Sequence, residues 1–483
     1  MTWNLIFAII YILYALGVII FLVMDRRSPQ STFAWLLLML GVPFLGLLFY
    51  VLSGRSWKAF SRENEYVRKD IGPELRALLM PIIPEQDAAI RSLKSSDSPP
   101  IYSRFLQLGR RNSYAVVTFN NNVQILQDAV EKYPVFYADL EAATDFIHLE
   151  YFSWASDPEM DKFNALLIEK VRQGVKVRLL FDAIGSLKLF KRADRNLLRA
   201  AGIEVEVFSP ILRFHTISYR NHRKIAVIDG KVGYVGGMNM GEEHLKGTGI
   251  YEAWRDTHLR IEGEAVRALQ AAFVADWYHA TKRKLTHERY FPVDNQDYGY
   301  VPVQLVSSGP DSRYESIRQM FFYMITSASH HVYIQSPFFV LDTSLTEGLK
   351  AAALSGVDVR IMLAPQSCGD NPLAYWAAFT YMLDVYAAGV KIYLYQPGYL
   401  HAKTVSVDGL VCTIGSANMD QRSFNVDYEI NAILYDRTLA QELEMRFRED
   451  LKDCVLFDPA EYRKLPFGMR FRDASARLLS PVL

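Results

Sequence analysis

The sequence predicts an α/β protein built from two similar halves, preceded by a helical membrane-spanning region. Three observations lead to this prediction. Two long uncharged apolar runs lie in the N-terminal region, β-type and helix-type runs alternate from about residue 110, and the pattern H-x-K-x4-D occurs twice, starting at His222 and His401. At 483 residues the chain is also too long for one ordinary hydrophobic core.

The N-terminal region is predicted to be a transmembrane hairpin over residues 1–57. The run from Trp3 to Met24 has no charged residue, and neither does the run from Thr32 to Leu52. Each is long enough to cross a hydrocarbon layer of roughly 30 Å as a helix. A cleaved signal peptide fits the first run poorly, because no Lys or Arg precedes it and the run is too long.

The orientation of this hairpin follows from its flanking charges. The polar link between the two runs carries Arg26 and Arg27, whereas the segment after the second run carries five basic residues, namely Arg55, Lys58, Arg62, Arg68 and Lys69. Basic residues favour the cytoplasmic side. We therefore expect a multi-pass protein of the cell membrane whose catalytic part lies on the cytoplasmic side.

Beyond a polar connector at 58–109, the chain repeats itself. A first half at 110–290 and a second half at 300–464 each contain three β-type runs separated by helix-type runs, and a tail follows at 465–483. The six runs are 146–152, 174–180 and 201–208 in the first half and 332–339, 356–363 and 388–395 in the second. This βαβ rhythm predicts a largely parallel sheet with helices on its faces in each half.

The duplicated motif is embedded in a longer duplicated segment. His222, Lys224 and Asp229 correspond to His401, Lys403 and Asp408, and a Gly and an Asn follow each His at the same distances, at Gly236 and Asn239 and at Gly415 and Asn418. Two imidazoles and two ammonium groups in matched settings predict one composite site for phosphate-ester chemistry. His215 lies in an eight-residue insertion of the first half, and we expect it to be a local loop residue.

The two Asp residues of the motif are weaker catalytic candidates than the His and Lys residues. Asp229-Gly230 and Asp408-Gly409 each separate two β-type runs, which is a hairpin signal. Seven residues of extended strand place each Asp about 20 Å from its His. Asp229 and Asp408 therefore belong to the motif but are expected to act as turn or scaffold residues.

Other polar residues complete the expected site. An imidazole needs an acceptor to fix its tautomer, and Asp256 and Glu429 are the candidates, each predicted to contact the His of its own half. The Gly-containing turns at 236–239 and 415–418 let the backbone approach a ligand, so Asn239, Asn418 and Ser416 are predicted to bind phosphate oxygens.

These residues predict a phosphoryl transfer through a covalent histidine. One neutral imidazole attacks phosphorus, the other His protonates the leaving alkoxide, and Lys224 and Lys403 stabilise the charge. No metal ion or other cofactor is expected, since the lysines supply the charge. The three Cys residues form no CxxC pair, and the balance of 53 basic and 53 acidic residues argues against nucleic acid as a partner.

At this point the sequence resembles the phospholipase D superfamily, whose mark is duplicated H-x-K-x4-D. The N-terminal Arg27-Ser-Pro and Pro43-Phe-Leu-Gly46 segments, Asn221-His-Arg-Lys224, Trp254-Arg-Asp256 and Asn418-Met-Asp420 are further similar to bacterial cardiolipin synthases. Two positions depart from that family, where Asn-Phe-Glu is common in place of Asp427-Tyr-Glu429 and Tyr is common in place of His244.

The resemblance implies the fold, the reaction and the partners. It implies two phospholipase D-like domains sharing one site, in which one phosphatidylglycerol forms a phosphatidyl-histidine and releases glycerol, and a second phosphatidylglycerol resolves it to cardiolipin. By family analogy His222 is the nucleophile and His401 the general acid and base, and the pseudo-symmetry leaves the reverse assignment open. The implied partners are phosphatidylglycerol and the lipid bilayer, and a homo-oligomer is compatible with the chain.

Three other functions are compatible with parts of the sequence. A phospholipase D-type hydrolase, or a transphosphatidylase of other phospholipids, would use the same residues with a different acceptor. A nuclease is disfavoured by the zero net charge and the apolar runs, and a non-catalytic membrane scaffold is disfavoured because both His-Lys pairs are intact.

Overall fold

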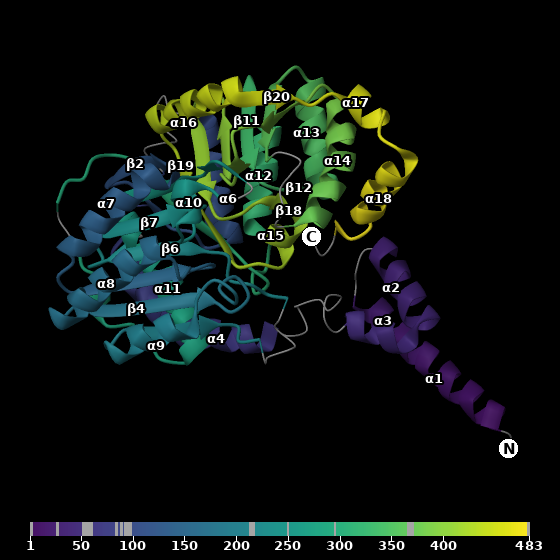
Figure 1. The fold of residues 1–483 in the computed structure, drawn as a ribbon, viewed down its shortest axis with the longest axis horizontal. Helices are drawn as coiled ribbons and strands as arrows, with labels where there is room; N and C mark the ends of the chain where they lie inside the picture. Colours follow the sequence, from purple (N-terminus) through teal and green to yellow (C-terminus); the bar gives the residue numbers. More distant parts are fainter. Residues whose placement is uncertain are drawn as a thin grey trace.

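The structure is a computed structural model of the whole chain. It describes residues 3–25, 29–50, 61–82, 86, 90, 99–211, 218–248, 251–293, 296–364 and 371–480. His215 of the insertion and Cys368 lie outside the described residues. Two β-sheets form the body of the molecule, and the N-terminal helices project away from it (Figure 1).

The first half is organised around a seven-stranded sheet. Its strands, in spatial order, are β2 (Asn121–Gln127), β9 (Thr257–Gly263), β7 (Val232–Gly236), β6 (Lys224–Ile228), β3 (Phe146–Tyr151), β4 (Lys176–Asp182) and β5 (Glu204–Phe208). One face is covered by α7 (Asp128–Ala142), α8 (Pro158–Arg172) and α9 (Arg192–Ala200), and the other by α11 (Ala265–Thr281).

The second half repeats this sheet strand for strand and adds one strand at each edge. The order is β1 (Val117–Thr118), β10 (Val303–Ser308), β19 (Glu429–Leu434), β17 (Val411–Gly415), β16 (Thr404–Val407), β11 (His331–Ser336), β13 (Asp358–Leu363), β14 (Lys391–Tyr395) and β20 (Cys454–Leu456). The edge strand β1 precedes the first sheet in the chain but pairs with β10 of the second.

The prediction of largely parallel sheets is correct for only part of each sheet. The three predicted runs of each half do pair in parallel, as β3, β4 and β5 and as β11, β13 and β14. The strands that carry the duplicated motif join them antiparallel, because tight hairpins connect β6 to β7 and β16 to β17. Both sheets are therefore mixed.

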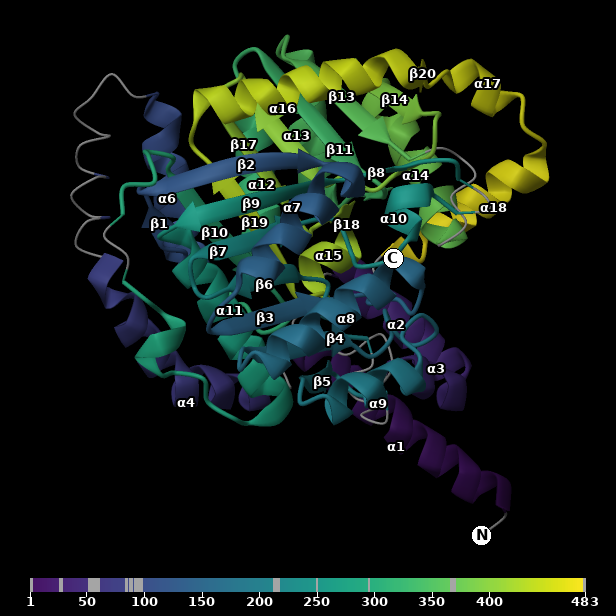
Figure 2. The ribbon, with the colours of Figure 1, turned by 60° about the vertical axis from the view of Figure 1, so that its left-hand side comes forward.

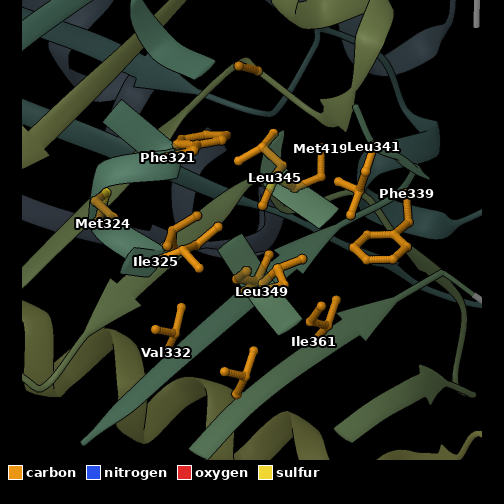
Figure 3. Packing of buried hydrophobic residues seen from close by; sticks show 14 of the residues in the cluster. Phe321, Met324, Ile325, Val332, Phe339, Leu341, Leu345, Leu349, Ile361 and Met419 are labelled. Carbon is orange, nitrogen blue, oxygen red and sulfur yellow. The ribbon is translucent and has the colours of Figure 1, made fainter. Parts of the chain in front are cut away.

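The hydrophobic core of the second half lies under three helices, α12 (Ser316–Thr326), α13 (Thr343–Leu354) and α14 (Pro372–Tyr386). Figure 3 shows Phe321, Met324 and Ile325 of α12 and Leu345 and Leu349 of α13 above Val332 and Ile361 of the sheet. Alternate residues of each strand point to this layer, which is the periodicity expected of a pleated sheet.

The opposite faces of the two sheets meet in a shared core. This core contains Ile225, Val227 and Val235 of the first sheet with Ile414 and Ile430 of the second. Helices α11 and α16 (Arg437–Asp450) border it, and Figure 2 shows β19 of the second sheet next to β7 of the first. The two halves are thereby fixed as one rigid unit around the space between their His-Lys pairs.

The N-terminal region differs from the predicted hairpin in its second run. Helix α1 (Trp3–Met24) is the one helix in the described part of the chain that is long and apolar enough to span a membrane. The second run is divided into α2 (Pro29–Gly41) and α3 (Pro43–Phe49), which measure about 20 Å and 10 Å. Within the described residues the second run is therefore not one continuous helix of membrane-spanning length, and a second span and a multi-pass topology are not supported there.

The division has a local cause in the sequence. Pro43 begins α3, and α3 folds back on α2 so closely that a Cβ on Gly46 would lie 2.6 Å from the Leu38 carbonyl oxygen. Tyr50 at the end of this turn packs against Phe21 and Trp35 and donates to the Asp25 carboxylate at 3.1 Å.

The remaining helices join these parts. Helix α4 (Ser61–Leu79) packs on α11, and α6 (Pro100–Asn112) packs on α12. An irregular segment containing η5 (Glu288–Tyr290) links the two halves between α11 and β10. At the C-terminus α18 (Phe467–Arg477) packs on α14 with Phe467 and Phe471 exposed.

Candidate active site

The motif aspartates hold the base of each motif hairpin. Asp229 and Asp408 lie in the turns with φ of 51° and 56°, as predicted for turn residues. The Asp229 carboxylate accepts hydrogen bonds from the backbone N–H groups of Thr144, Asp145 and Phe146 at 2.7–2.8 Å. These bonds connect the β6–β7 turn to the start of β3, at the end of the hairpin remote from His222.

The second half repeats the same clamp. The Asp408 carboxylate accepts from the backbone N–H groups of Ser329, His330 and His331 at 2.7–2.8 Å. Neither aspartate lies within hydrogen-bond distance of a motif His, so both fix the strand that presents the His and Lys rather than the imidazole itself.

Each motif His is positioned by a short pairing between the two halves. The segment β15 (Tyr399–Leu400) pairs in parallel with β8 (Trp254–Arg255), and the His401 N–H donates to the Arg255 carbonyl at 2.7 Å. On the other side Asn221 forms a parallel bridge with Tyr428, and the His222 N–H donates to the Tyr428 carbonyl at 3.0 Å. In each of these pairings the residue that follows one of the two paired segments is a His, and the residue that follows the other segment carries a carboxylate.

This pairing corrects the prediction that each carboxylate contacts the His of its own half. His222 Nδ1 lies 2.9 Å from Glu429 Oε1, and His401 Nδ1 lies 2.7 Å from Asp256 Oδ2. The two halves exchange their carboxylates because parallel segments in register bring the residues after Arg255 and Leu400, and after Asn221 and Tyr428, side by side. Neither half contains a complete His-carboxylate pair alone.

Both imidazoles are nearly enclosed. His222 is 9% exposed and packs against the Phe152 ring, whereas His401 is 8% exposed and packs against Trp254 and Tyr399. Burial lowers the pKa of His222 to about 4, against the opposing effect of Glu429. Burial, reinforced by the Lys403 and Lys224 charges, lowers the pKa of His401 well below its usual value. Both rings are therefore neutral at physiological pH before an anion binds.

The two carboxylates differ in the state that their surroundings favour. Burial alone would raise the pKa of Glu429, but the adjacent His222 and Lys224 and a hydrogen bond from Ser416 bring it below its usual value. The pKa of Asp256 is raised, because burial outweighs the lowering effects of Lys403 and of the hydrogen bond from the Thr257 backbone N–H. The surroundings thus shift the pKa values of the two carboxyl groups in opposite directions.

The two lysines converge on the same space. Each ammonium donates to the backbone carbonyl of its own motif His, Lys224 to His222 at 2.6 Å and Lys403 to His401. Burial lowers the pKa of Lys224 well below its usual value and that of Lys403 to about 8, and the Lys403 charge lowers the pKa of Lys224 further. A bound anion between the two would relieve both penalties, which is the electrostatic signature of a phosphate site.

The Gly-containing turns place two of the three predicted phosphate ligands at the site. Asn239 and Asn418 are both buried, and Asn239 Oδ1 accepts from the Ser153 N–H at 3.3 Å, which turns its NH2 group away from that backbone. Asn418 Oδ1 has no partner within the described residues. The unpaired atom of Asn418 is an acceptor, which suits a donor group of a ligand and not a phosphate oxygen, so the phosphate-binding role of both amides stays a prediction.

Ser416 does not fit the predicted phosphate-binding role. Its hydroxyl donates to Glu429 Oε2 and accepts from the Ile430 N–H at 3.0 Å, and it is fully buried. The matching residue of the first half, Gly237, has no room for a side chain, since a Cβ there would lie 2.1 Å from Asp256 Oδ1. Ser416 thus positions the carboxylate partner of His222, and Asp256 has no such hydroxyl.

Sequence reasoning missed several residues of this arrangement. The aromatic walls formed by Phe152, Trp254 and Tyr399 carry no motif, and the exchange of carboxylates depends on segments of two residues. One sequence signal of a difference between the two halves was available, namely Gly236-Gly237 against Gly415-Ser416 in otherwise matching turns.

The fold and this site define a class of protein. Two mixed sheets related by an internal repeat, with two buried His-Lys pairs facing one space, are the architecture of a phospholipase D-type phosphoryl-transfer enzyme. A family model described as "Cardiolipin synthase, PLD-like domain" matches residues 136–277 and 321–451, and a model described as "Phospholipase_D-nuclease N-terminal" matches residues 6–55.

Curated relatives extend over nearly the whole chain. The cardiolipin synthase of Geobacillus kaustophilus is 40% identical over 95% of this chain and 90% of its own. The major cardiolipin synthase ClsA of Bacillus subtilis is 37% identical over 99% of each chain. Among solved structures, phosphatidylserine synthase from Haemophilus influenzae has a TM-score of 0.59 at 14% identity, covering 79% of this chain and 99% of that one, which supports the fold.

The chain belongs to the bacterial cardiolipin synthases of the phospholipase D superfamily. It is a phosphatidyltransferase whose substrates are phospholipids in a membrane, and α1 together with the matched N-terminal family model supports membrane association.

Proposed function

We propose that this enzyme transfers a phosphatidyl group from one phosphatidylglycerol to a hydroxyl of a second, giving cardiolipin and glycerol through a phosphatidyl-histidine. The observation that carries the proposal is the exchange of carboxylates between the halves, at 2.9 Å for His222–Glu429 and 2.7 Å for His401–Asp256. It supplies two oriented imidazoles, and burial together with the charges of Lys224 and Lys403 lowers the pKa of both rings.

In the first step His222 is the nucleophile. The ionised Glu429 accepts the Nδ1–H of His222, which leaves the lone pair of Nε2 free to attack phosphorus. A phosphorus–nitrogen bond forms as the bond from phosphorus to the glycerol oxygen breaks. Lys224, Lys403 and Asn239 hold the non-bridging oxygens, whose charge they stabilise in the transition state.

His401 gives a proton to the departing glycerol oxygen. In this proposal the Asp256 carboxyl, whose pKa is raised, is protonated and donates to Nδ1, so the hydrogen of the neutral imidazole lies on Nε2. As His401 gives up this hydrogen, the Asp256 proton moves to Nδ1, and it returns to Asp256 in the second step. In the second step the roles reverse, and His401 takes the proton of the incoming hydroxyl while that oxygen attacks phosphorus and His222 leaves. Protons and bonds balance over the two steps without another reactant.

The enclosure of the site also favours a lipid hydroxyl over water as the second reactant. The site is nearly enclosed around both imidazoles, so an acceptor that remains in the bilayer reaches it more readily than bulk water. A hydrolase that releases phosphatidic acid is the second candidate, and it shares every residue named above.

The catalytic halves are assigned to the cytoplasmic side of the cell membrane. The excess of Lys and Arg after the apolar N-terminal runs supports this side. In addition, Phe467 and Phe471 are exposed on α18, which lies near α2 in Figure 1, so this end of the body is suited to rest on lipid. We further place the domain boundaries at 110–290 and 300–464.

The test uses the purified full-length enzyme with phosphatidylglycerol alone. Cardiolipin and glycerol in equal amounts are the expected products, with glycerol released before cardiolipin in a rapid-mixing experiment. Phosphatidic acid as the main product would reject the synthase in favour of the hydrolase.

A further inference from the structure

A cluster of polar atoms beside His401 is left unused by the mechanism above. His244 lies on the short helix α10 (Glu243–Lys246), which contacts β8, and the two elements lie next to each other in Figure 2. Its ring centroid is 6.2 Å from that of His401 and 4.8 Å from that of Trp254. All three rings are buried.

Within the described part of the chain, these side chains have no hydrogen-bond partners for three polar atoms. Both ring nitrogens of His244 and Nε1 of Trp254 are buried and unpaired. A Glu243 carboxylate oxygen lies 4.0 Å from Nε2 of His244, beyond hydrogen-bond distance. Buried polar atoms are almost always paired, so three together at the edge of a reaction site point to a ligand.

The chemistry of these atoms selects the kind of ligand. Burial and the neighbouring cations keep His244 neutral by lowering its pKa well below the usual value. A neutral imidazole offers one donor and one acceptor, and the Trp254 indole offers one donor. A hydroxyl both donates and accepts, whereas a phosphate oxygen at physiological pH only accepts. The cluster therefore matches an alcohol better than a phosphate.

We propose that His244 and Trp254 form a subsite for the hydroxyl next to the reacting oxygen of the glycerol headgroup. This inference rests on the proposed function, which places the leaving and entering oxygens against His401. A glycerol headgroup whose terminal oxygen faces His401 carries its neighbouring hydroxyl one carbon further on, toward the His244 ring. The subsite would make the enzyme select vicinal diols as acceptors.

The experiment compares two acceptor alcohols that differ by one hydroxyl. Full-length enzyme in mixed micelles with a phosphatidylglycerol donor is given propane-1,2-diol or propan-1-ol, and the phosphatidyl-alcohol products are quantified. For the unchanged enzyme we expect the diol to be preferred by roughly 10- to 100-fold in kcat/KM, because the mono-alcohol leaves buried polar groups unpaired.

The variants separate a binding role from a packing role. His244→Phe and His244→Met remove the hydrogen bonds and should reduce the preference to within about threefold of unity, whereas His244→Gln keeps a donor and an acceptor and should retain part of it. Trp254→Phe should reduce it less, since one donor is lost. Trp277→Phe is the matched control, because Trp277 Nε1 is also buried and unpaired but lies on α11 away from His401.

The outcomes are distinct. Loss of the diol preference in the apolar His244 variants, with no change in Trp277→Phe, supports the subsite. An unchanged preference in a folded apolar His244 variant, or no preference in the unchanged enzyme, overturns it. Failure of the proposed function is seen in a different measurement. With phosphatidylglycerol alone the enzyme would then give phosphatidic acid in place of cardiolipin. The preference between the two alcohols is still measured from their phosphatidyl-alcohol products.

Discussion

The two halves share every backbone feature of the site and differ in how they treat the carboxylate. Glu429 of the second half accepts a hydrogen bond from the Ser416 hydroxyl and is held ionised beside His222. Asp256, contributed by the first half, faces Gly237 and has a raised pKa beside His401. A repeat that began with two equal motifs thus presents one imidazole suited to attack and one suited to donate a proton.

This difference shows how the two halves of a duplicated site can take different catalytic roles while the duplicated residues stay the same. Both motif histidines, both lysines and both turn aspartates are retained, and the division lies in the residues around them. A single exchange of Gly for Ser in the turn after the motif gives Glu429 a hydroxyl donor, whereas Asp256 accepts from the Thr257 backbone N–H. The reverse assignment of nucleophile and acid is then no longer equivalent to the proposed one, and it can be tested.

The largest expected effect comes from removing each imidazole. His222→Ala and His401→Ala should each reduce turnover by roughly four orders of magnitude, because each removes a group that acts in both steps. Only His401→Ala should still form a covalent adduct, slowly, and accumulate it. Quenching of a single turnover with denaturant at neutral pH, using acyl-labelled phosphatidylglycerol, measures this, since the phosphorus–nitrogen bond is labile in acid. Label retained on His222→Ala instead would reverse the assignment.

The partner carboxylates test the same comparison one step further out. Glu429→Gln removes the charge that holds the Nδ1–H tautomer of His222, and adduct formation should fall by about 100-fold or more. Asp256→Asn can still donate to Nδ1 of His401, as a protonated carboxyl does, so adduct formation should fall by less than about tenfold while resolution slows more.

Rapid-quench rates for the two steps measure this contrast in a matched pair of amide variants. Equal losses of adduct formation in Glu429→Gln and Asp256→Asn would mean that the carboxylates are equivalent and that the asymmetry has no consequence for catalysis.

Much of this arrangement could be predicted from the sequence, and the reasons are physical. The Asp-Gly turns, the three parallel strands of each half and the duplicated motif depend on local patterns that a single chain displays. The sheets were predicted as largely parallel because the periodicity of a strand does not encode the direction of its neighbour. The second membrane run was predicted as one helix because composition does not reveal the backward turn at Pro43.

The exchange of carboxylates could not be predicted, since it depends on pairings of two residues or fewer between distant segments. Such segments have no periodicity to detect. Ser416 was predicted to bind phosphate because its turn matches a phosphate-binding turn, whereas the buried Glu429 competes for its hydroxyl and holds it.

The turn clamps test stability more than catalysis. Asp229→Asn and Asp408→Asn tolerate the positive φ but replace one carboxylate oxygen by an NH2 group, so that the backbone N–H of Thr144 or Ser329 loses its acceptor, and each should lower the free energy of unfolding by about 1–3 kcal/mol. Thermal unfolding in detergent measures the loss, which should be slightly greater for Asp229, since it also accepts from the Thr144 hydroxyl. If a folded variant lost activity by more than about 100-fold, the scaffold role would be wrong and a catalytic one right.

The smallest effect should come from Ser416→Ala, which makes the second half resemble the first. The Ser416 hydroxyl helps to lower the pKa of Glu429, so its removal should raise that pKa. Activity requires an ionised Glu429 and a neutral His222, and it is lost as the pH falls through the titration of this pair. The acid limb of kcat/KM should therefore move to higher pH, with a loss of about two- to fivefold at neutral pH.

Asn418→Ala is a useful comparison in the same turn, because a lost ligand contact should lower kcat/KM at every pH without moving the limb. A limb that stays in place in Ser416→Ala would show that the hydroxyl does not set the state of Glu429.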